Sequence, residues 1–125
     1  MVKYLFSLCV LVFLLGGNTL QAQSLSDLDG KTWKDNTTSL DVLAQAMEDA
    51  DAAARVDQLA TSAIVALKFK MTLIMQVSLR LADRKSVPDA IWEGYQESVN
   101  GIDQKTIDPA DQAAVFTDVV GLLQK

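Results

Sequence analysis

The sequence predicts a small all-α domain, a bundle of three to four helices that follows an N-terminal signal peptide. Two observations favour helices. Between Gly30 and Pro88 the chain contains neither glycine nor proline, and short strands joined by tight turns need such residues. The same stretch is rich in Ala, Leu, Met and Gln, which prefer helices to strands. A third observation, a set of helix-capping sequences, divides the chain into elements.

The first element is an apolar run from Tyr4 to Leu15 that directly follows Lys3. A membrane-spanning helix needs about 20 apolar residues, so a run of this length fits the apolar core of a signal peptide better. We expect cleavage after Ala22, which leaves residues 23–125 as one helical domain. The alternative is a signal that is retained as a membrane anchor.

Charge and cysteine content bound the location and the partners. The chain has 16 acidic and 11 basic residues, for a net charge of −5, which argues against nucleic acid as a partner. The one cysteine, Cys9, lies within the expected signal peptide, so the domain is predicted to have no disulfide. Small secreted domains often depend on disulfides. We therefore expect a secreted or periplasmic protein whose stability comes from packing alone.

Three capping sequences predict helix starts. Thr38, Ser86 and Asp108 each stand three residues before an aspartate, as in a capping box, and a proline lies in the first turn after the last two. Gly101 marks the end of the helix that begins after Ser86.

The stretch 40–83 would form a rod of about 66 Å if it were one helix, which is longer than a domain of this size is wide. We therefore expect a break or a tight hairpin within residues 48–57, where aspartates interrupt the apolar pattern. An unbroken rod would instead indicate a coiled-coil dimer, because heptad spacing of apolar residues continues through this stretch with two polar interruptions.

Residues 65–81 carry conflicting signals. Every odd position from Val65 to Leu81 is apolar, and this period of two is typical of a strand. Seventeen residues exceed the usual length of a strand, however, and the residue types favour a helix. We predict a central helix that is contacted on two sides, with a second apolar face of Val65, Phe69 and Leu79. The first and broader face consists of Ile64, Leu67, Met71, Ile74, Val77 and Leu81. The two following helices each have one apolar face. The first face consists of Ile91, Trp92, Tyr95 and Val99, and the second of Ala113, Phe116, Val120 and Leu123. Leu25, Leu28 and Trp33 are expected to close one end of the bundle.

The residue types available for chemistry are few. The whole chain lacks histidine and residues 23–125 lack cysteine, which removes the commonest general base, thiolate nucleophile and zinc ligands. The acidic residues Glu48, Asp49, Asp51 and Asp57 match no calcium loop, and Glu93 and Glu97 are expected to be surface charges. The sequence therefore predicts no enzyme, no cofactor and no metal site.

The basic residues concentrate in the stretch from Lys68 to Lys85. We expect them to pair with the acidic residues on the other arm of the hairpin, and the alternative is contact with a membrane or an anionic partner.

The leading functional hypothesis is a non-catalytic interaction module. Its partner would be a protein or a small apolar ligand, bound at a face that includes Met71, Met75, Trp92 or Tyr95, since methionine and aromatic side chains adapt well to partners. The alternative is a membrane-associated protein that uses residues 65–81 or a retained signal anchor.

Overall fold

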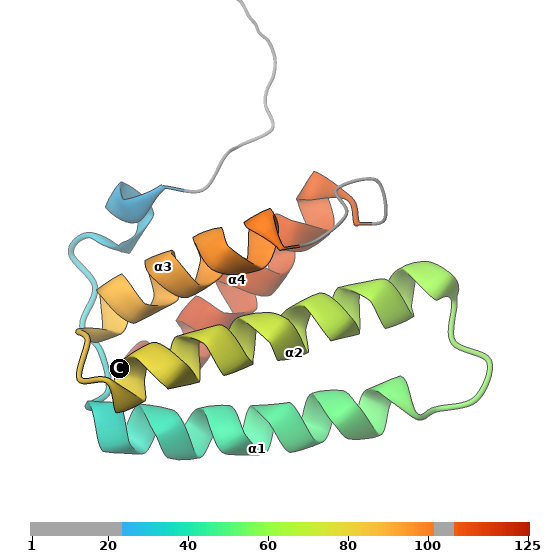
Figure 1. Ribbon diagram of the computed structural model, residues 1–125, viewed down its shortest axis with the longest axis horizontal. Coiled ribbons are helices and arrows are strands. Elements are labelled where there is room, and N and C mark those ends of the chain that lie inside the picture. Colours follow the sequence, from blue (N-terminus) through green and yellow to red (C-terminus); the bar gives the residue numbers. More distant parts are fainter. Residues whose placement is uncertain (1–23, 102–106) are drawn as a thin grey trace, which may run out of the picture.

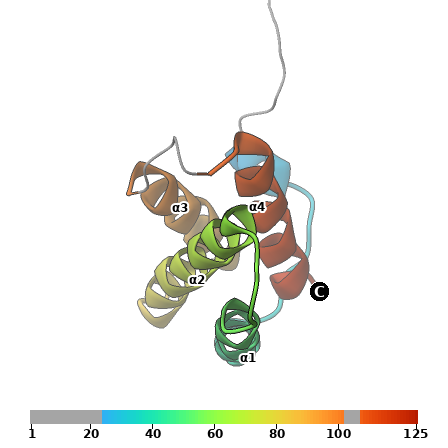
Figure 2. The same cartoon turned by 90° about the vertical axis from the view of Figure 1, so that its right-hand side faces the viewer.

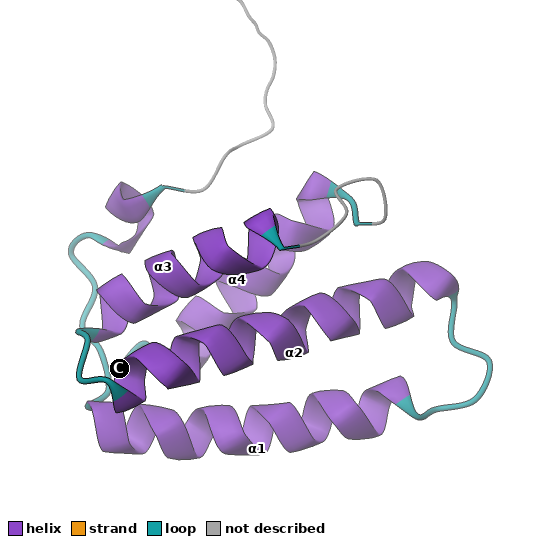
Figure 3. Cartoon of the chain, viewed as in Figure 1, coloured by secondary structure: helices purple, strands orange, loops and turns teal. Residues whose placement is uncertain are grey.

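The computed structural model describes residues 24–101 and 107–125, and in these residues the chain is helical with no strand (Figure 1, Figure 3). The elements in chain order are the short 3-10 helix η2 (Leu25–Leu28), α1 (Asn36–Ala54), α2 (Thr61–Ala82), α3 (Val87–Asn100) and α4 (Pro109–Leu123). The predicted all-α class is confirmed, with four α-helices in this part of the chain. The expected signal peptide, 1–22, lies outside the described residues.

Helices α1 and α2 form an antiparallel hairpin. The connection runs from Arg55 to Ala60, so the predicted break is confirmed and the single rod is wrong. The break lies later than expected, because Asp49 and Asp51 belong to α1 and only residues 55–57 of the expected range 48–57 are in the connection. The side-chain amide of Asn36, at the start of α1, donates hydrogen bonds to the carbonyl oxygens of Leu81 at 3.2 Å and Lys85 at 2.9 Å. These bonds hold the first turn of α1 against the last turn of α2. The coiled-coil dimer that a rod would have indicated therefore has no support from this fold.

Two of the three predicted helix starts are confirmed. Ser86 and Asp108 are the N-cap residues of α3 and α4; the Ser86 hydroxyl accepts a hydrogen bond from the backbone of Asp89 at 3.4 Å, whereas the Asp108 side chain makes no capping hydrogen bond. The predicted cap at Thr38 is wrong, because α1 begins earlier and its cap is Asp35, whose carboxylate accepts from the backbone N–H of Thr38 at 2.8 Å. That hydrogen bond lowers the pKa of the Asp35 carboxyl below its ordinary 3.8.

Helix α2 lies at the centre, with α1, α3 and α4 around three of its sides (Figure 2). The prediction of a helix rather than a strand over 65–81 is confirmed. Close packing against α3 depends on Gly94, since a Cβ atom added there would lie 2.9 Å from Val77 Cγ2 and 3.1 Å from the Val77 backbone nitrogen. The core is formed mainly by apolar residues of α2, α3 and α4: Phe69, Leu73, Ile74, Val77, Leu81, Val87, Ala90, Ile91, Tyr95, Val115, Phe116, Val119, Val120 and Leu123.

The segment before α1 joins the end of the chain. Trp33 forms an isolated antiparallel bridge with Gln124, and the Lys34 ammonium donates to the carbonyl oxygens of Leu122 at 2.8 Å and Gln124 at 3.1 Å. These bonds satisfy carbonyl groups at the end of α4 that have no partner within the helix. Leu28 is buried and Trp33 packs against the core, as predicted. Leu25 is 44% exposed and does not close the bundle.

Candidate binding surface on helix α2

Alternate apolar residues along α2 point in opposite directions. Two residues along an α-helix correspond to a rotation of about 200°, so a residue and its second neighbour lie on nearly opposite sides. Leu73, Val77 and Leu81 are 0%, 0% and 2% exposed, whereas Met75 and Leu79 between them are 49% and 59% exposed. The period of two in the sequence therefore supplies two apolar faces, one in the core and one in contact with solvent.

We call the solvent-facing side the outer face of α2. Its members follow helical spacing and are exposed or half-buried: Ile64, Lys68, Met71, Met75 and Leu79. The stripe is about 22 Å long at 1.5 Å per residue. Met75 and Leu79 are two of the four exposed large apolar residues in the described part of the chain, and they lie one turn apart on the same side.

Helix α1 borders the outer face on one side. The hydrogen bonds of Asn36 fix the register of the antiparallel pair, so Met47, eleven residues later, lies about level with Met71. Leu40 and Met47 share the side of α1 that carries Asn36, and both are half-buried against the core. They extend the apolar surface from α2 onto α1.

Helix α3 borders the outer face on the other side. Glu93 contacts α2 through Arg80, with 3.7 Å between Oε1 and Nε, and it also contacts Lys85 at 3.2 Å. Glu97 follows one turn later and is exposed. Because α2 and α3 are antiparallel and Gly94 lies on Val77, Glu97 lies about level with Gln76 and Thr72.

The four residues expected to form one partner face are separated in the structure. Met71 and Met75 belong to the outer face of α2. Trp92 and Tyr95 lie in an aromatic cluster of the bundle, where the Tyr95 ring centroid is 6.1 Å from that of Trp92 and 4.6 Å from that of Phe116. Tyr95 is only 9% exposed, and burial raises the pKa of its hydroxyl above the ordinary 10.0. This cluster belongs to the core and Trp92 is its half-buried edge.

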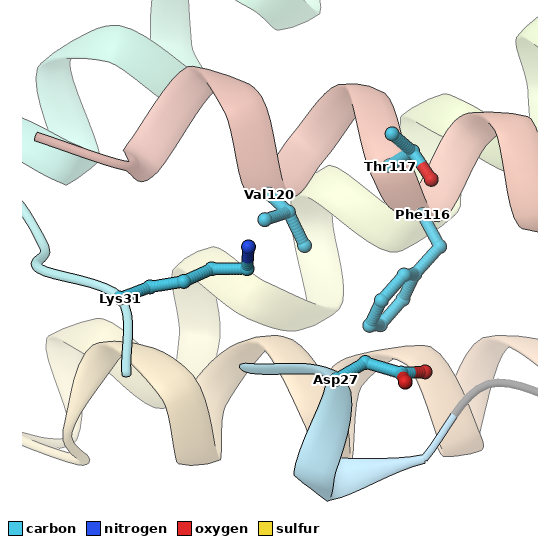
Figure 4. Close-up of a pocket in the computed structure, with 5 residues that line it drawn as sticks. All are labelled: Asp27, Lys31, Phe116, Thr117 and Val120. Carbon is cyan, nitrogen blue, oxygen red and sulfur yellow. The ribbon is translucent and has the colours of Figure 1, made fainter. Parts of the chain in front are cut away.

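A shallow depression lies between η2 and α4 (Figure 4). It is lined by Phe116, Thr117 and Val120 of α4 and by Asp27 and Lys31. Its volume is about 160 Å³, whereas pockets for small organic ligands usually hold about 300 Å³ or more. A drug-sized apolar ligand does not fit there.

The acidic residues that the structure describes do not converge on a common point. Within residues 24–101 and 107–125, no group of three or more Asp and Glu side chains is placed to share a metal ion. Asp51 pairs with Arg55 of the same helix, and Glu93 pairs with Arg80 and Lys85. In this part of the chain no ion pair joins α1 to α2, so the predicted pairing across the hairpin is wrong and α3 supplies the partner carboxylate instead.

No family model, no curated protein and no solved structure matches the chain. The geometry of the described residues therefore carries the functional argument.

Sequence reasoning missed Leu79, the most exposed apolar residue of the outer face. Its residue type suggested a second buried face of α2 together with Val65 and Phe69, and of these Phe69 is buried and Val65 half-buried. The signal that could have found Leu79 is the alternation itself, because a helix with apolar residues at every second position needs cover on opposite sides. Three neighbouring helices leave one such side open (Figure 2).

Proposed function

We propose that this protein is an exported, non-catalytic binding module and that a partner protein docks on the outer face of α2. The observation that carries the proposal is the pair Met75 and Leu79, 49% and 59% exposed on the central helix of the bundle. Polar residues at these two positions would be equally compatible with the helix and would not expose apolar surface to solvent. Clustered exposed apolar side chains mark interaction sites more often than single ones do.

Further support comes from the composition of the face. Methionine side chains are flexible and polarizable, and they pack against partners of varied shape. Met71 and Met75 lie in the outer face, and Met47 of α1 lies beside it. The proposal of export depends on the apolar run from Tyr4 to Leu15, and the proposal of no catalysis depends on the absence of histidine from the chain and of cysteine from residues 23–125.

A site-specific crosslinking experiment tests the proposal. A photo-reactive amino acid replaces Met75 in the full chain, and in a matched variant it replaces Val56, which is 58% exposed in the connection between α1 and α2. After irradiation in the cells that produce the protein, we expect one discrete protein adduct from position 75 and none from position 56. Equal labelling at both positions, or no adduct at position 75, contradicts the proposal.

One observation favours a second candidate function, association with a membrane. Among the described helices, α2 is long and apolar enough to cross a bilayer by length and composition. Spanning the bilayer would require α2 to leave α1, α3 and α4, with which it shares the core. Contact at the membrane surface through the outer face is the form compatible with the fold, and it would bury Met75 and Leu79 among lipid headgroups and chains.

Vesicle flotation distinguishes the two candidates. The purified protein is mixed with vesicles of zwitterionic lipid and with vesicles that also contain anionic lipid. Under the first proposal we expect the protein to remain at the bottom of the gradient with both. Flotation that is lost when Met75 and Leu79 are replaced by glutamine would favour the membrane function instead.

A further inference from the structure

We infer that the partner segment that docks on the outer face of α2 is a cationic amphipathic helix. This inference rests on the proposed function, because it names the chemistry of the partner at the same surface. It is carried by the distribution of charge around the apolar stripe, which differs from helix to helix.

The two helices that border the outer face are acidic. Helix α1 contains four acidic residues and no basic residue between Asn36 and Ala54, and α3 contains three acidic residues and no basic residue. Six of these seven carboxylates are exposed, and Glu93 is half-buried; the exposed six are Asp41, Glu48, Asp49, Asp51, Asp89 and Glu97. We call these two borders the acidic rims. On α1, Asp51 and Glu48 lie about 60° and 120° around the helix from Asn36, whereas Asp49 lies about 140° away in the other direction. Negative charge beside the apolar stripe therefore comes from Asp51 and Glu48 on one side and from Glu97 of α3 on the other.

Cations compensate only part of the charge on the rims: Asp51 pairs with Arg55 at 3.1 Å and Glu93 pairs with Arg80 and Lys85, whereas within the described residues Glu48 and Glu97 form no ion pair. Arg80 is held by Glu93 and by the Gln76 side chain, to which it donates a hydrogen bond of 2.8 Å. Lys70 is half-buried and lies five residues before Met75, a rotation of about 140° away from it. Lys68 is therefore the cation of α2 that lies in the outer face, near the end of the stripe. Arg84 is exposed just beyond the other end.

The charges beside the outer face favour some binding partners over others. A second copy of the chain, docked face to face, would bring its own acidic rims against these rims, and opposed like charges are unfavourable. An anionic lipid surface would meet the same repulsion. A helix with one apolar side and Lys or Arg along its flanks would cover Met71, Met75 and Leu79 and place its cations opposite Glu97 and the carboxylates of α1. A stripe of about 22 Å accommodates about 15 residues of such a helix.

The test uses two synthetic helical peptides of about 15 residues that differ only in charge. Both carry leucine along one side, and the flanking positions are lysine in one peptide and glutamate in the other. Calorimetric titration against the purified protein is expected to show binding of the lysine peptide that weakens as salt rises, because exposed charges are screened. The glutamate peptide is expected not to bind.

Two protein variants locate the binding. Replacing Met75 and Leu79 by glutamine is expected to weaken binding of the lysine peptide at least about tenfold, since the centre of an interface carries most of its affinity. Replacing Glu48, Asp51 and Glu97 by their amides is expected to weaken it several-fold and to remove most of the salt dependence. The matched control is Val56→Gln, which lies outside the outer face and is expected to change nothing. Binding that is absent, insensitive to charge, or unchanged in both variants overturns the inference.

The crosslinking experiment and the titration fail separately. If position 75 forms an adduct with a partner segment that is neutral or acidic, the proposed binding function is supported and the inference of a cationic helix is rejected. A lack of any adduct at position 75 removes the proposed function itself. An adduct whose contact segment is a Lys- or Arg-flanked helix, together with the expected titrations, supports both.

Discussion

The two faces of α2 have nearly the same residue types and opposite environments. Leu73 and Val77 on the inner face are 0% exposed, whereas Met75 and Leu79 on the outer face are 49% and 59% exposed. The difference comes from the neighbours of the helix. Helices α1, α3 and α4 cover three sides of α2 and leave the fourth side open (Figure 2). Apolar residues along a helix therefore indicate surface that gains free energy when it is buried. The tertiary packing determines which part of that surface is buried by other helices of the same chain.

The largest expected effect comes from truncating a matched pair of leucines. Leu73→Ala removes a fully buried side chain and is expected to lower the free energy of unfolding by about 2–5 kcal/mol, because it leaves a cavity in addition to the lost burial. Leu79→Ala is expected to change it by no more than about 0.5 kcal/mol, since leucine and alanine have similar helix propensities and the side chain is exposed. Urea unfolding of both variants measures the comparison, and similar losses would show that the two faces are not distinct.

A second pair of substitutions tests the contact between Gly94 of α3 and Val77 on the inner face of α2. Gly94→Ala is expected to destabilise the protein by about 1–2 kcal/mol, because the new Cβ would meet both the side chain and the backbone of Val77. Gly121→Ala is the control, since a Cβ there meets nothing within 4 Å. That variant is expected to gain about 0.5 kcal/mol from helix propensity. Thermal unfolding distinguishes the two, and a stabilised Gly94→Ala variant would mean that α2 and α3 are not in close contact.

A pH titration examines the aromatic cluster on the inner side of α2, where the Tyr95 ring contacts Phe69 with centroids 6.4 Å apart. Burial disfavours the charged tyrosinate and raises the pKa of Tyr95 above 10.0 in the folded chain. The contribution of this group to stability is therefore complete below pH 10 and is lost as the pH rises through the folded-state pKa. Ultraviolet absorbance of a Tyr4→Phe chain, in which Tyr95 is the single tyrosine, measures the midpoint. The unfolded chain in denaturant is the reference, and an equal midpoint in both states would contradict the burial.

The smallest expected effect is on the outer face itself. Replacing Met75 and Leu79 together by glutamine is expected to change the free energy of unfolding by less than about 0.5 kcal/mol, because glutamine is a good helix former and both positions are exposed. Circular dichroism during urea unfolding provides the measurement. A large loss of stability would show that these side chains belong to the core, and it would remove the reason to assign them to a partner.

Local chemistry made several elements predictable. Ser86, Asp108 and Gly101 mark helix ends because capping depends on residues within one turn of the chain. The same rule produced one wrong boundary, since we predicted the cap at Thr38, and Asp35, which is also a strong capping residue, caps α1 instead. The hairpin between α1 and α2 was predictable from length, because an unbroken helix would exceed the width of the domain.

The candidate site was less predictable. Met71 and Met75 were identified from residue type, and the structure leaves Met75 exposed. Trp92 and Tyr95 were grouped with them because aromatic residues serve both cores and interfaces, and the chain uses these two in its core. Residue type does not separate these uses, because both depend on the same gain from removing apolar surface from water.

The amino-acid sequence by itself determined the all-α class, the presence of the hairpin, both ends of α3, the start of α4 and the poverty of catalytic side chains. These features depend on backbone propensity, on interactions within a turn, and on which residue types are present. Only the tertiary structure decided that Leu81 is in the core and Leu79 is in solvent, and that Glu93 pairs with Arg80 across two helices. Such differences arise from contacts between distant segments, and the position of three helices around α2 is the physical reason that one of its apolar sides has no cover.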